Sequence, residues 1–285
     1  MVDYKNCPDV AIEAFDSIFN PTPSVEIVDW PIFNQITGGL RMNEFSIICG
    51  GTGVGKTTFL ANISAALLKQ SVPHFVMSVE TGHVDYMRRV ISCLAGMDLN
   101  TCEKINPDNP ELQKTIANVL PIVSRDMIKF STHENRISCE QLLIELKFMN
   151  EIFGSSVAII DNLNFFLEVT SSTETILEMD RVVHDIIMFC KEHKMHIFMV
   201  MHPKKTDHGQ VLSEFDIKGS STAVQEAQNI FLLNRPTQKE CENIKDLRIT
   251  DRLLKIAKMR RRGRFVGKTI VYQSNGVNYY EKGTF

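Results

Sequence analysis

Residues 50–57 read Gly-Gly-Thr-Gly-Val-Gly-Lys-Thr, which fills every fixed position of the Gly-x4-Gly-Lys-Thr phosphate-binding pattern. An apolar run, Phe45–Cys49, precedes these residues, and apolar positions at helical spacing follow from Thr58 onward. In that order a strand delivers the loop, glycines let backbone N–H groups close around phosphate oxygens, and the helix N-terminus adds partial positive charge. The alternative, a glycine-rich turn that precedes a helix by chance, is disfavoured by the complete pattern. We therefore predict that the chain binds a nucleoside triphosphate.

The phosphate loop also predicts the cofactors, which are ATP or another nucleoside triphosphate together with Mg²⁺. Lys56 can reach the β- and γ-phosphates, and the Thr57 hydroxyl can bind the metal ion. The predicted nucleotide contacts run along the loop into the following helix and are Gly51, Thr52, Gly53, Val54, Gly55, Lys56, Thr57 and Thr58.

Composition sets broad limits on the kind of protein. The 285 residues suffice for one large domain, or one domain with a small appendage, and 44% hydrophobic residues are ample for a core. A net charge of -3 shows no overall basic signature of nucleic-acid binding, so any such surface must be local. The seven cysteines lack metal-binding spacing and favour reduced thiols, and no apolar stretch approaches a membrane span of about 20 residues. These features predict a soluble intracellular protein.

Apolar strands alternate with amphipathic helices along most of the chain. The predicted strands are residues 45–49, 75–79, 157–161, 196–201 and 229–233. Helices are predicted at 83–95, 138–153, 175–193 and 223–227, with residues 98–120 mostly helical up to Pro121. Residues 253–257 and 268–272 form a predicted antiparallel pair joined by a basic turn. The predicted fold is therefore an α/β P-loop domain, a mostly parallel sheet with helices on both faces and antiparallel strands at one edge.

The N-terminal residues contain a short amphipathic stretch, residues 10–19, that ends at Asn20-Pro21-Thr22-Pro23. Two interpretations remain open for it: a frayed terminus whose apolar residues pack locally, or an arm that docks on another subunit. We divide the chain accordingly into an N-terminal arm, residues 1–24, and a nucleotide-binding domain, residues 25–285.

Three polar residues follow predicted strands at positions where ligands gather. Ligands of open α/β sheets bind at the carboxyl ends of strands, and Glu80, Asp161 and His202 stand there. Asp161 suits Mg²⁺ binding, and Glu80 suits a base that polarises the attacking water. His202 can sense the γ-phosphate through a hydrogen bond that vanishes on hydrolysis. The respective alternatives are a turn aspartate, a solvated strand-end glutamate and a structural histidine.

Two basic segments in the second half of the chain could contact phosphate groups. Residues 203–221 form a polar loop whose glycines, small hydroxyl residues and lysines suit a phosphodiester backbone, with a solvated surface loop as the alternative. Residues 258–264 read Lys-Met-Arg-Arg-Arg-Gly-Arg. They form either a solvated hairpin tip or a lysine and an arginine that reach a neighbouring subunit's nucleotide. Such an arginine finger implies an oligomer, because one protomer cannot complete its own site.

The order of these motifs resembles the RecA-like motor domain of hexameric replicative helicases. The chain is similar to the mitochondrial helicase Twinkle and the phage helicase-primases, with bacterial DnaB helicases next, over about residues 25–280. The phosphate loop itself is shared with many other NTPases. More specific to these helicases are the segments Met201–Lys205, Lys218–Ser221 and Lys258–Arg260.

The resemblance implies a role for the residues around the phosphate loop. Glu80 would be the catalytic base, and Asp161 would coordinate Mg²⁺ together with Thr57. His202 would be the γ-phosphate sensor, a role that DnaB relatives give to a glutamine. Arg235 falls where relatives stack an arginine on the nucleotide base.

The resemblance also implies contacts with a neighbouring subunit and with DNA. Lys258 and Arg260 would reach the γ-phosphate from the adjacent subunit, although the basic turn is longer than in relatives, so Arg264 competes with Arg260 for the finger role. The loop 203–221 would line a central channel and grip single-stranded DNA. The implied DNA contacts are Lys204, Lys205, Lys218 and Gly219.

As a whole, the resemblance implies an ATP-driven DNA helicase motor. Such a motor moves along single-stranded DNA, 5′ to 3′, as a hexameric ring that hydrolyses NTP at its subunit interfaces. The expected partners are single-stranded DNA, further copies of the chain, and a primase or helicase loader, with no membrane. The expected location is the cytoplasm of a bacterial or phage-infected cell, with a mitochondrial location left open. With no primase domain or DnaB-type N-terminal collar in the sequence, we expect either an excised motor domain or a minimal phage or plasmid helicase.

Two other classes of ATPase remain as alternatives. A RecA-like recombinase or helicase loader would bind single-stranded DNA without unwinding it, and a KaiC-like or signalling ATPase would have no DNA partner. The Lys-x-Arg pair and the lysine-bearing loop favour the helicase. A recombinase would more often carry a longer second loop and an aromatic polymerisation motif, neither of which we find.

Overall fold

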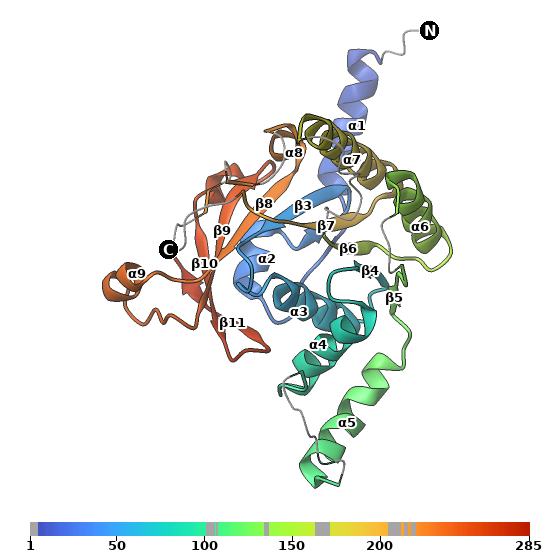
Figure 1. Ribbon diagram of the computed structural model, residues 1–285. Helices are drawn as coiled ribbons and strands as arrows, with labels where there is room; N and C mark the ends of the chain where they lie inside the picture. The colour runs from blue at the N-terminus through green and yellow to red at the C-terminus, as the bar shows by residue number, and fades with distance from the viewer. Residues whose placement is uncertain are drawn as a thin grey trace.

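The computed structural model describes residues 5–100, 106, 108–133, 137–162, 172–204, 212–213, 216–217 and 221–285, apart from the side chains of 172–176 and 221–223. These residues form a large sheet with the strand order β11-β10-β9-β8-β3-β7-β6-β4-β5 (Figure 1). Its strands are β3 (Glu44–Cys49), β4 (His74–Ser78), β5 (Ile128–Phe130), β6 (Val157–Asp161), β7 (His196–Met201), β8 (Asn229–Asn234), β9 (Arg252–Met259), β10 (Thr269–Ser274) and β11 (Tyr279–Thr284). The strands from β3 to β8 are parallel, and β9, β10 and β11 extend one edge in antiparallel pairing, as the sequence predicts.

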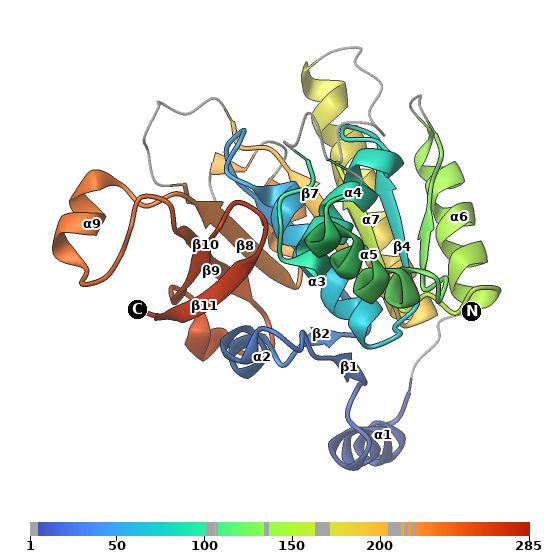
Figure 2. The same ribbon diagram turned by 90° about the horizontal axis from the view of Figure 1, so that it is seen from below.

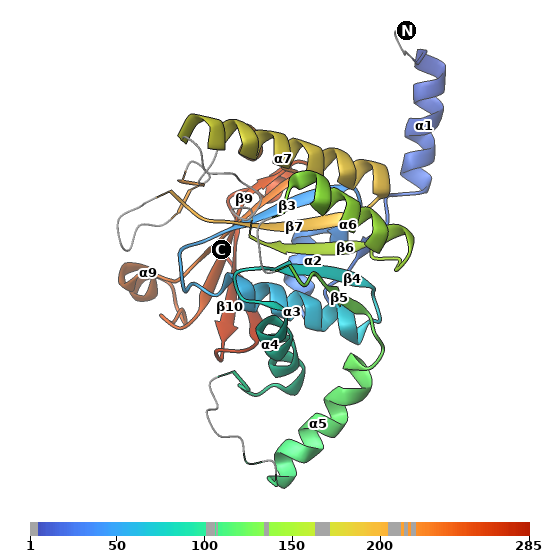
Figure 3. The same ribbon diagram turned by 45° about the vertical axis from the view of Figure 1, so that its right-hand side comes forward.

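Helices cover both faces of the parallel strands, which confirms the predicted α/β class (Figure 3). The helices are α1 (Cys7–Phe19), α2 (Pro31–Thr37), α3 (Lys56–Lys69), α4 (His83–Ala95), α5 (Pro110–Val123), α6 (Cys139–Glu151), α7 (Ser172–His193), α8 (Ser221–Glu226) and α9 (Gln238–Asn243). On one face, Leu60 of α3 and Val90 of α4 belong to one buried cluster. On the other face, Leu146 of α6 and Ile186 of α7 belong to a second cluster. Strands buried on both faces explain the continuous apolar runs in the sequence.

Residues 98–120, predicted to be mostly helical, are helical from Pro110 onward in the described part of the chain. Residues 98–100 and 108–109 are not helical, and α5 begins only at Pro110, where Asn109 caps its first N–H groups. Proline at the first helical position is preorganised for a helix and lacks the N–H that would stay unbonded there. Pro121 does not end α5 but lies within its last turn, where it removes only one hydrogen bond near the end of the helix.

The antiparallel edge is larger than predicted, because β11 was not recognised in the sequence. This strand reads Tyr-Tyr-Glu-Lys-Gly-Thr and buries only Tyr279 fully on its core side. Charged residues are common in edge strands, and a strand with few apolar positions carries a weak periodic signal. The short β5 and α9 were also not predicted. Within the described residues no helix is long and apolar enough to cross a membrane.

The N-terminal residues join the body through α2 and a small antiparallel pair, β1 (Ser24–Val25) and β2 (Leu40–Arg41). The α2 region lies against β11 (Figure 2), where the Trp30 indole N–H donates to the Tyr279 carbonyl oxygen at 2.8 Å. By contrast, α1 projects from the body and none of its residues is buried (Figures 1 and 3). The interpretation of residues 10–19 as a terminus whose apolar residues pack locally is therefore wrong. The docking of this stretch on another subunit and the division of the chain at residue 24 stay predictions.

Candidate active site

The phosphate loop connects the carboxyl end of β3 to the first turn of α3, so the predicted contacts from Gly51 to Thr58 lie at one edge of the sheet. Gly53 and Gly55 have φ angles of 73° and 102°, in the left-handed region that glycine adopts without a Cβ penalty. A Cβ on Gly50 would lie 2.6 Å from the Leu233 carbonyl oxygen of β8. No side chain caps α3, so its first N–H groups can bind phosphate oxygens.

Lys56 folds back over this loop and is nearly buried. Its Nζ donates to the carbonyl oxygens of Gly50, at 2.8 Å, and Gly51, at 3.1 Å. Burial lowers the pKa of Lys56, and the nearby carboxylates of Asp161 and Glu80 oppose that shift. The ammonium group thus lies within the loop, where phosphate oxygens can replace the two carbonyl acceptors.

Thr57 and Asp161 meet beside the loop, as the sequence predicts. The Thr57 hydroxyl donates to Asp161 Oδ2 at 2.9 Å. Burial raises the pKa of Asp161 to about 6, and the hydrogen bond from Thr57 opposes that shift. A cation would offset the cost of burying this carboxylate. The pair fits Mg²⁺, which commonly takes one or two protein oxygens and completes its shell with water and phosphate. The described residues offer no cluster of three or more His, Cys, Asp and Glu for a metal held by protein alone.

Glu80 and His202 also come together, and Asn162 lies between them. The Asn162 amide nitrogen is 2.5 Å from Glu80 Oε2 and 3.1 Å from His202 Nε2. His202 Nε2 and Glu80 Oε2 are 3.6 Å apart. Because the three residues follow β4, β6 and β7, the parallel sheet brings them to the edge that holds the phosphate loop. The sequence predicted Glu80 and His202, but it assigned no role to Asn162.

Side chains from β9, from β11 and from the residue that follows β8 contact the backbone of the phosphate loop. Their contacts are with three successive carbonyl oxygens: Arg235 donates to Gly53 at 2.7 Å, Arg252 Nε to Val54 at 2.7 Å, and the Tyr279 hydroxyl to Gly55 at 3.1 Å. Only Arg235 was predicted near the nucleotide. Arg252 and Tyr279 are about 200 residues from the loop in sequence, so no local pattern signals these contacts.

Lys258 and Arg260 lie at the opposite edge of the sheet. In the β8–β9 pairing, Met259 faces Asn229 at the amino end of β8. Arg252, which touches the loop, is six residues from Lys258 along β9, or about 20 Å at 3.3 Å per residue. Lys258 Nζ donates to the α8 carbonyl oxygen of Val224 at 2.7 Å. Within one subunit, these two cations therefore cannot reach the subunit's own phosphate loop.

The remaining cations of the basic turn differ in what they contact. Arg262 donates to the Gln35 carbonyl oxygen at 2.7 Å, and Arg261 pairs with Glu44 at 3.3 Å. Arg264 is exposed, with its guanidinium carbon 4.8 Å from the centre of the Phe265 ring. Both Arg260 and Arg264 are exposed, so the choice between them as the finger stays a prediction.

Of the predicted DNA contacts, only Lys204 belongs to the described residues; Lys205, Lys218 and Gly219 lie outside them. Lys204 is exposed, and its backbone N–H donates to the Asp216 carbonyl oxygen at 2.6 Å. An isolated bridge also pairs Pro203 with Ile217. Residues 203–204 and 216–217 of the predicted DNA loop are thus paired just beyond β7.

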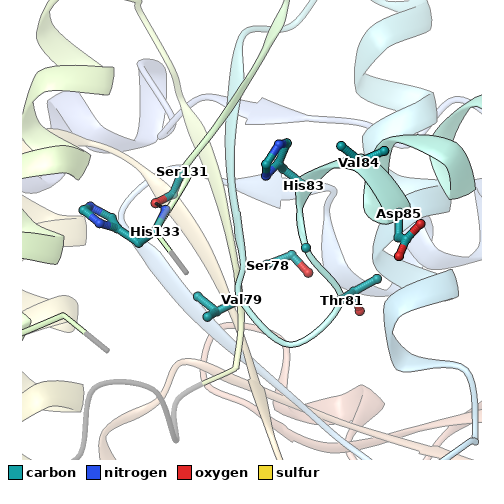
Figure 4. Close-up of a pocket in the computed structure, with 9 residues that line it drawn as sticks. Ser78, Val79, Thr81, His83, Val84, Asp85, Ser131 and His133 are labelled. Carbon is teal, nitrogen blue, oxygen red and sulfur yellow. Dashed lines mark hydrogen bonds between the residues drawn. The ribbon is translucent and has the colours of Figure 1, made fainter. Parts of the chain in front are cut away.

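A cavity of about 270 Å³ adjoins the turn that carries Glu80 (Figure 4). It opens between the ends of β4 and β5 and the first turn of α4, and its lining includes no residue of the phosphate loop. The residues around it are Ser78, Val79, Thr81, Gly82, His83, Val84, Asp85, Ser131 and His133. The cavity therefore shares no lining residue with the phosphate loop.

The DnaB-like helicase C-terminal domain matches this chain over residues 29–281, which is most of its length. The chain belongs to this family. The same RecA-like fold is found in a solved ATPase domain, with a TM-score of 0.80 and 13% identity over 98% of this chain and 99% of that one. A DnaB-like replicative helicase studied with primase has a TM-score of 0.77 and 14% identity, covering 98% of this chain and 67% of that one.

Curated relatives agree with this assignment. The replicative DNA helicase DnaB of Leifsonia xyli is 23% identical over 74% of this chain, and the DNA helicase/primase of Enterobacteria phage T3 is 21% identical over 83%. A probable replicative DNA helicase of Trieres chinensis is 22% identical over 80%. The alignments cover 46%, 41% and 51% of these relatives, so the chain spans about half of their length.

Proposed function

We propose that this chain hydrolyses ATP as the motor of a ring-shaped replicative helicase that moves 5′ to 3′ on single-stranded DNA. The separation of two half-sites in one subunit carries the proposal. Lys56, Asp161 and Glu80 lie at the carboxyl edge of the sheet, whereas Lys258 and Arg260 lie at the amino edge. A second copy that presents its amino edge to the phosphate loop would complete the site. Such head-to-tail contacts form closed rings when the rotation between subunits permits, here proposed as a hexamer.

In the proposed reaction, the loop N–H groups and Lys56 bind the phosphates of ATP. Bound Mg²⁺, held by Thr57 and Asp161, would neutralise charge on the β- and γ-phosphates. Glu80 polarises the water that attacks the γ-phosphorus, and the bond to the ADP oxygen breaks as the new bond forms. Arg260, with Lys258, would stabilise the charge from the adjacent subunit. His202 lies at the start of the 203–221 loop and would report the loss of the γ-phosphate to that loop.

The partners follow from the loop and from α1. Lys204, with the predicted contacts Lys205, Lys218 and Gly219, would bind DNA phosphates in the channel, so affinity should fall steeply with salt. Residues 1–24, the arm, would dock α1 on the neighbouring subunit, and residues 25–285 would be the motor. The similar helicase studied with primase supports a primase or loader as a further partner in a bacterial or phage-infected cell.

A forked DNA duplex tests the activity itself. We expect the chain to unwind it only when ATP and Mg²⁺ are present, and we expect single-stranded DNA to accelerate ATP hydrolysis. DNA-stimulated hydrolysis without unwinding would instead indicate a recombinase or helicase loader. A rate of ATP hydrolysis that is the same with and without single-stranded DNA would contradict every DNA-dependent proposal, including the predicted channel loop.

Mixing two inactive variants tests the shared site. Lys56→Ala disables the phosphate loop, which we call the acceptor half of the site, and Arg260→Ala disables the finger, which we call the donor half. Each variant alone should be inactive in ATP hydrolysis. Arg260→Ala should still bind nucleotide. An equal mixture should recover about one quarter of the wild-type turnover, because random assembly makes that share of interfaces complete. Repeating the mixture with Arg264→Ala identifies the finger, since only a donor-defective variant is rescued by Lys56→Ala. Failure of both mixtures would contradict the shared site.

A further inference from the structure

The basic turn that carries Arg260 is tied to the first residue of the central strand β3. Glu44 Oε1 lies 3.3 Å from Nε of Arg261 and 3.5 Å from Nε of Arg41. Its other oxygen, Oε2, accepts a hydrogen bond of 2.9 Å from the Asn229 side-chain amide. The carboxylate thus joins the starts of β3 and β8 to the residue next to the proposed finger.

Glu44 is buried, so its carboxylate depends on nearby cations and hydrogen-bond donors to compensate its charge. Its side chain is only 7% exposed, whereas that of Arg261 is 57% exposed. A buried carboxylate is costly unless cations and hydrogen bonds compensate it. Neither arginine contact with Oε1 meets hydrogen-bond geometry, so charge attraction from Arg41 and Arg261 is what compensates this oxygen. Glu44 therefore holds the Nε end of the exposed Arg261 side chain against the start of β3.

A second set of contacts fixes the backbone of Arg260 to the same place. The Arg260 N–H donates to the Gln228 carbonyl oxygen at 3.0 Å. The Gln228 side chain in turn accepts a hydrogen bond from the Phe45 N–H at 2.9 Å. Residues 260 and 261 are consequently held in register with Glu44 and Phe45. The Arg260 guanidinium donates to the Gln225 carbonyl oxygen at 2.5 Å and is exposed, so it can turn while its backbone stays in place.

We propose that Glu44 is a positioning residue for catalysis at the neighbouring subunit's nucleotide, acting through Arg261 on the placement of Arg260. This inference rests on the proposed function, in which Arg260 acts in trans. A flexible finger would lose part of its effect, because a displacement of about 1 Å can cost roughly a hundredfold in rate. A buried ion pair that served stability alone would have no such consequence for the adjacent site.

The experiment uses Glu44→Gln, which keeps the shape of the side chain but removes its charge, and Arg261→Ala at the exposed partner. Each should lower the kcat of DNA-stimulated ATP hydrolysis by about tenfold to a hundredfold, with unchanged nucleotide affinity. Lys268→Ala removes an exposed cation close by in sequence and should leave kcat unchanged. The double variant should be no slower than the slower single variant, because the two residues act through one contact.

Mixing separates positioning from a general loss of stability. If Glu44 acts through the finger, Glu44→Gln is donor-defective, so Lys56→Ala should rescue it and Arg260→Ala should not. A wild-type kcat in Glu44→Gln, or equal rescue of Glu44→Gln by Lys56→Ala and Arg260→Ala, would overturn this inference and leave the proposed function standing. If Lys56→Ala and Arg260→Ala fail to rescue each other, the shared site itself is wrong, and this inference fails with it. An Arg261→Ala effect that adds fully to that of Glu44→Gln would contradict the coupling and make Arg261 a finger in its own right.

Discussion

Asn162 connects the two side chains that the sequence assigns to the chemistry of ATP hydrolysis. Its amide group contacts both Glu80 and His202. This contact gives the proposed base and the proposed sensor a common support at the carboxyl edge of the sheet. A base of this kind must be held within hydrogen-bond reach of the water that it polarises.

Replacing the proposed base tests this arrangement at the level of one residue. We expect Glu80→Gln to lower ATP turnover by about 10²- to 10⁴-fold, because the amide cannot accept a proton from the attacking water. Nucleotide affinity should stay the same. Steady-state turnover and titration with a fluorescent nucleotide measure the two quantities. Asp85→Asn is the matched control, since this carboxylate is exposed and lines the neighbouring cavity. Normal turnover in Glu80→Gln would exclude the base role.

Among the helices, α1 has apolar residues that the rest of the subunit does not cover. Phe15 and Ile18 are 63% and 68% exposed, and Phe19 is 79% exposed. A group of large apolar side chains on a projecting helix is a typical protein-contact surface. The proposed occupant is a second copy of this chain, which the heterologous ring requires in any case.

A double substitution on α1 tests this contact. Phe15→Ser with Ile18→Ser should shift the protein from oligomer to monomer in a native mass measurement. The free energy of unfolding of the monomer should change by no more than about 0.5 kcal/mol, because neither residue is buried. Ile249→Ser alters another exposed apolar residue, which is 56% exposed and lies outside α1, and should leave the oligomer intact. An unchanged mass in the double variant would exclude α1 as the contact.

The stability of the whole molecule depends on polar groups inside the sheet. His74 on β4 and His196 on β7 are both buried, and burial lowers the pKa of each to about 4. In the unfolded chain their ordinary pKa is 6.5, so the unfolded state binds protons first as the pH falls. The contribution of these two histidines to the free energy of unfolding is therefore fully present above pH 6.5. It decreases as the pH falls from 6.5 to 4, by at most about 1.4 kcal/mol per pH unit for each histidine.

Urea unfolding at pH 7.5 and 5.5 checks this dependence. We expect a lower unfolding free energy at pH 5.5, and a smaller decrease in His196→Gln than in the wild type. The comparison isolates the histidine from Asp161, whose raised pKa acts in the opposite direction. The same decrease in both proteins would show that His196 does not cause it.

Local patterns were sufficient for the parallel half of the molecule. Each strand from β3 to β8 except β5 is a buried apolar run, and the polar residue after a strand lies at a predictable edge of the sheet. For this reason Thr57, Asp161, Glu80 and His202 could be placed together from the sequence. Residues 98–120 and β11 were harder to predict, because a polar segment and a charged edge strand have weak periodicity.

The sequence by itself determined that the chain carries a phosphate loop and that Asp161, Glu80 and His202 lie at the same edge of the sheet, since these residues follow apolar strands of one parallel sheet. Only the tertiary structure decided that Arg252 and Tyr279 hold the loop, that Asn162 joins Glu80 to His202, and that Glu44 anchors the basic turn. It also decided that Lys258 and Arg260 lie at the far edge of the sheet. The physical reason is that such contacts arise from antiparallel pairing and side-chain packing between segments distant in the chain, for which no local pattern exists.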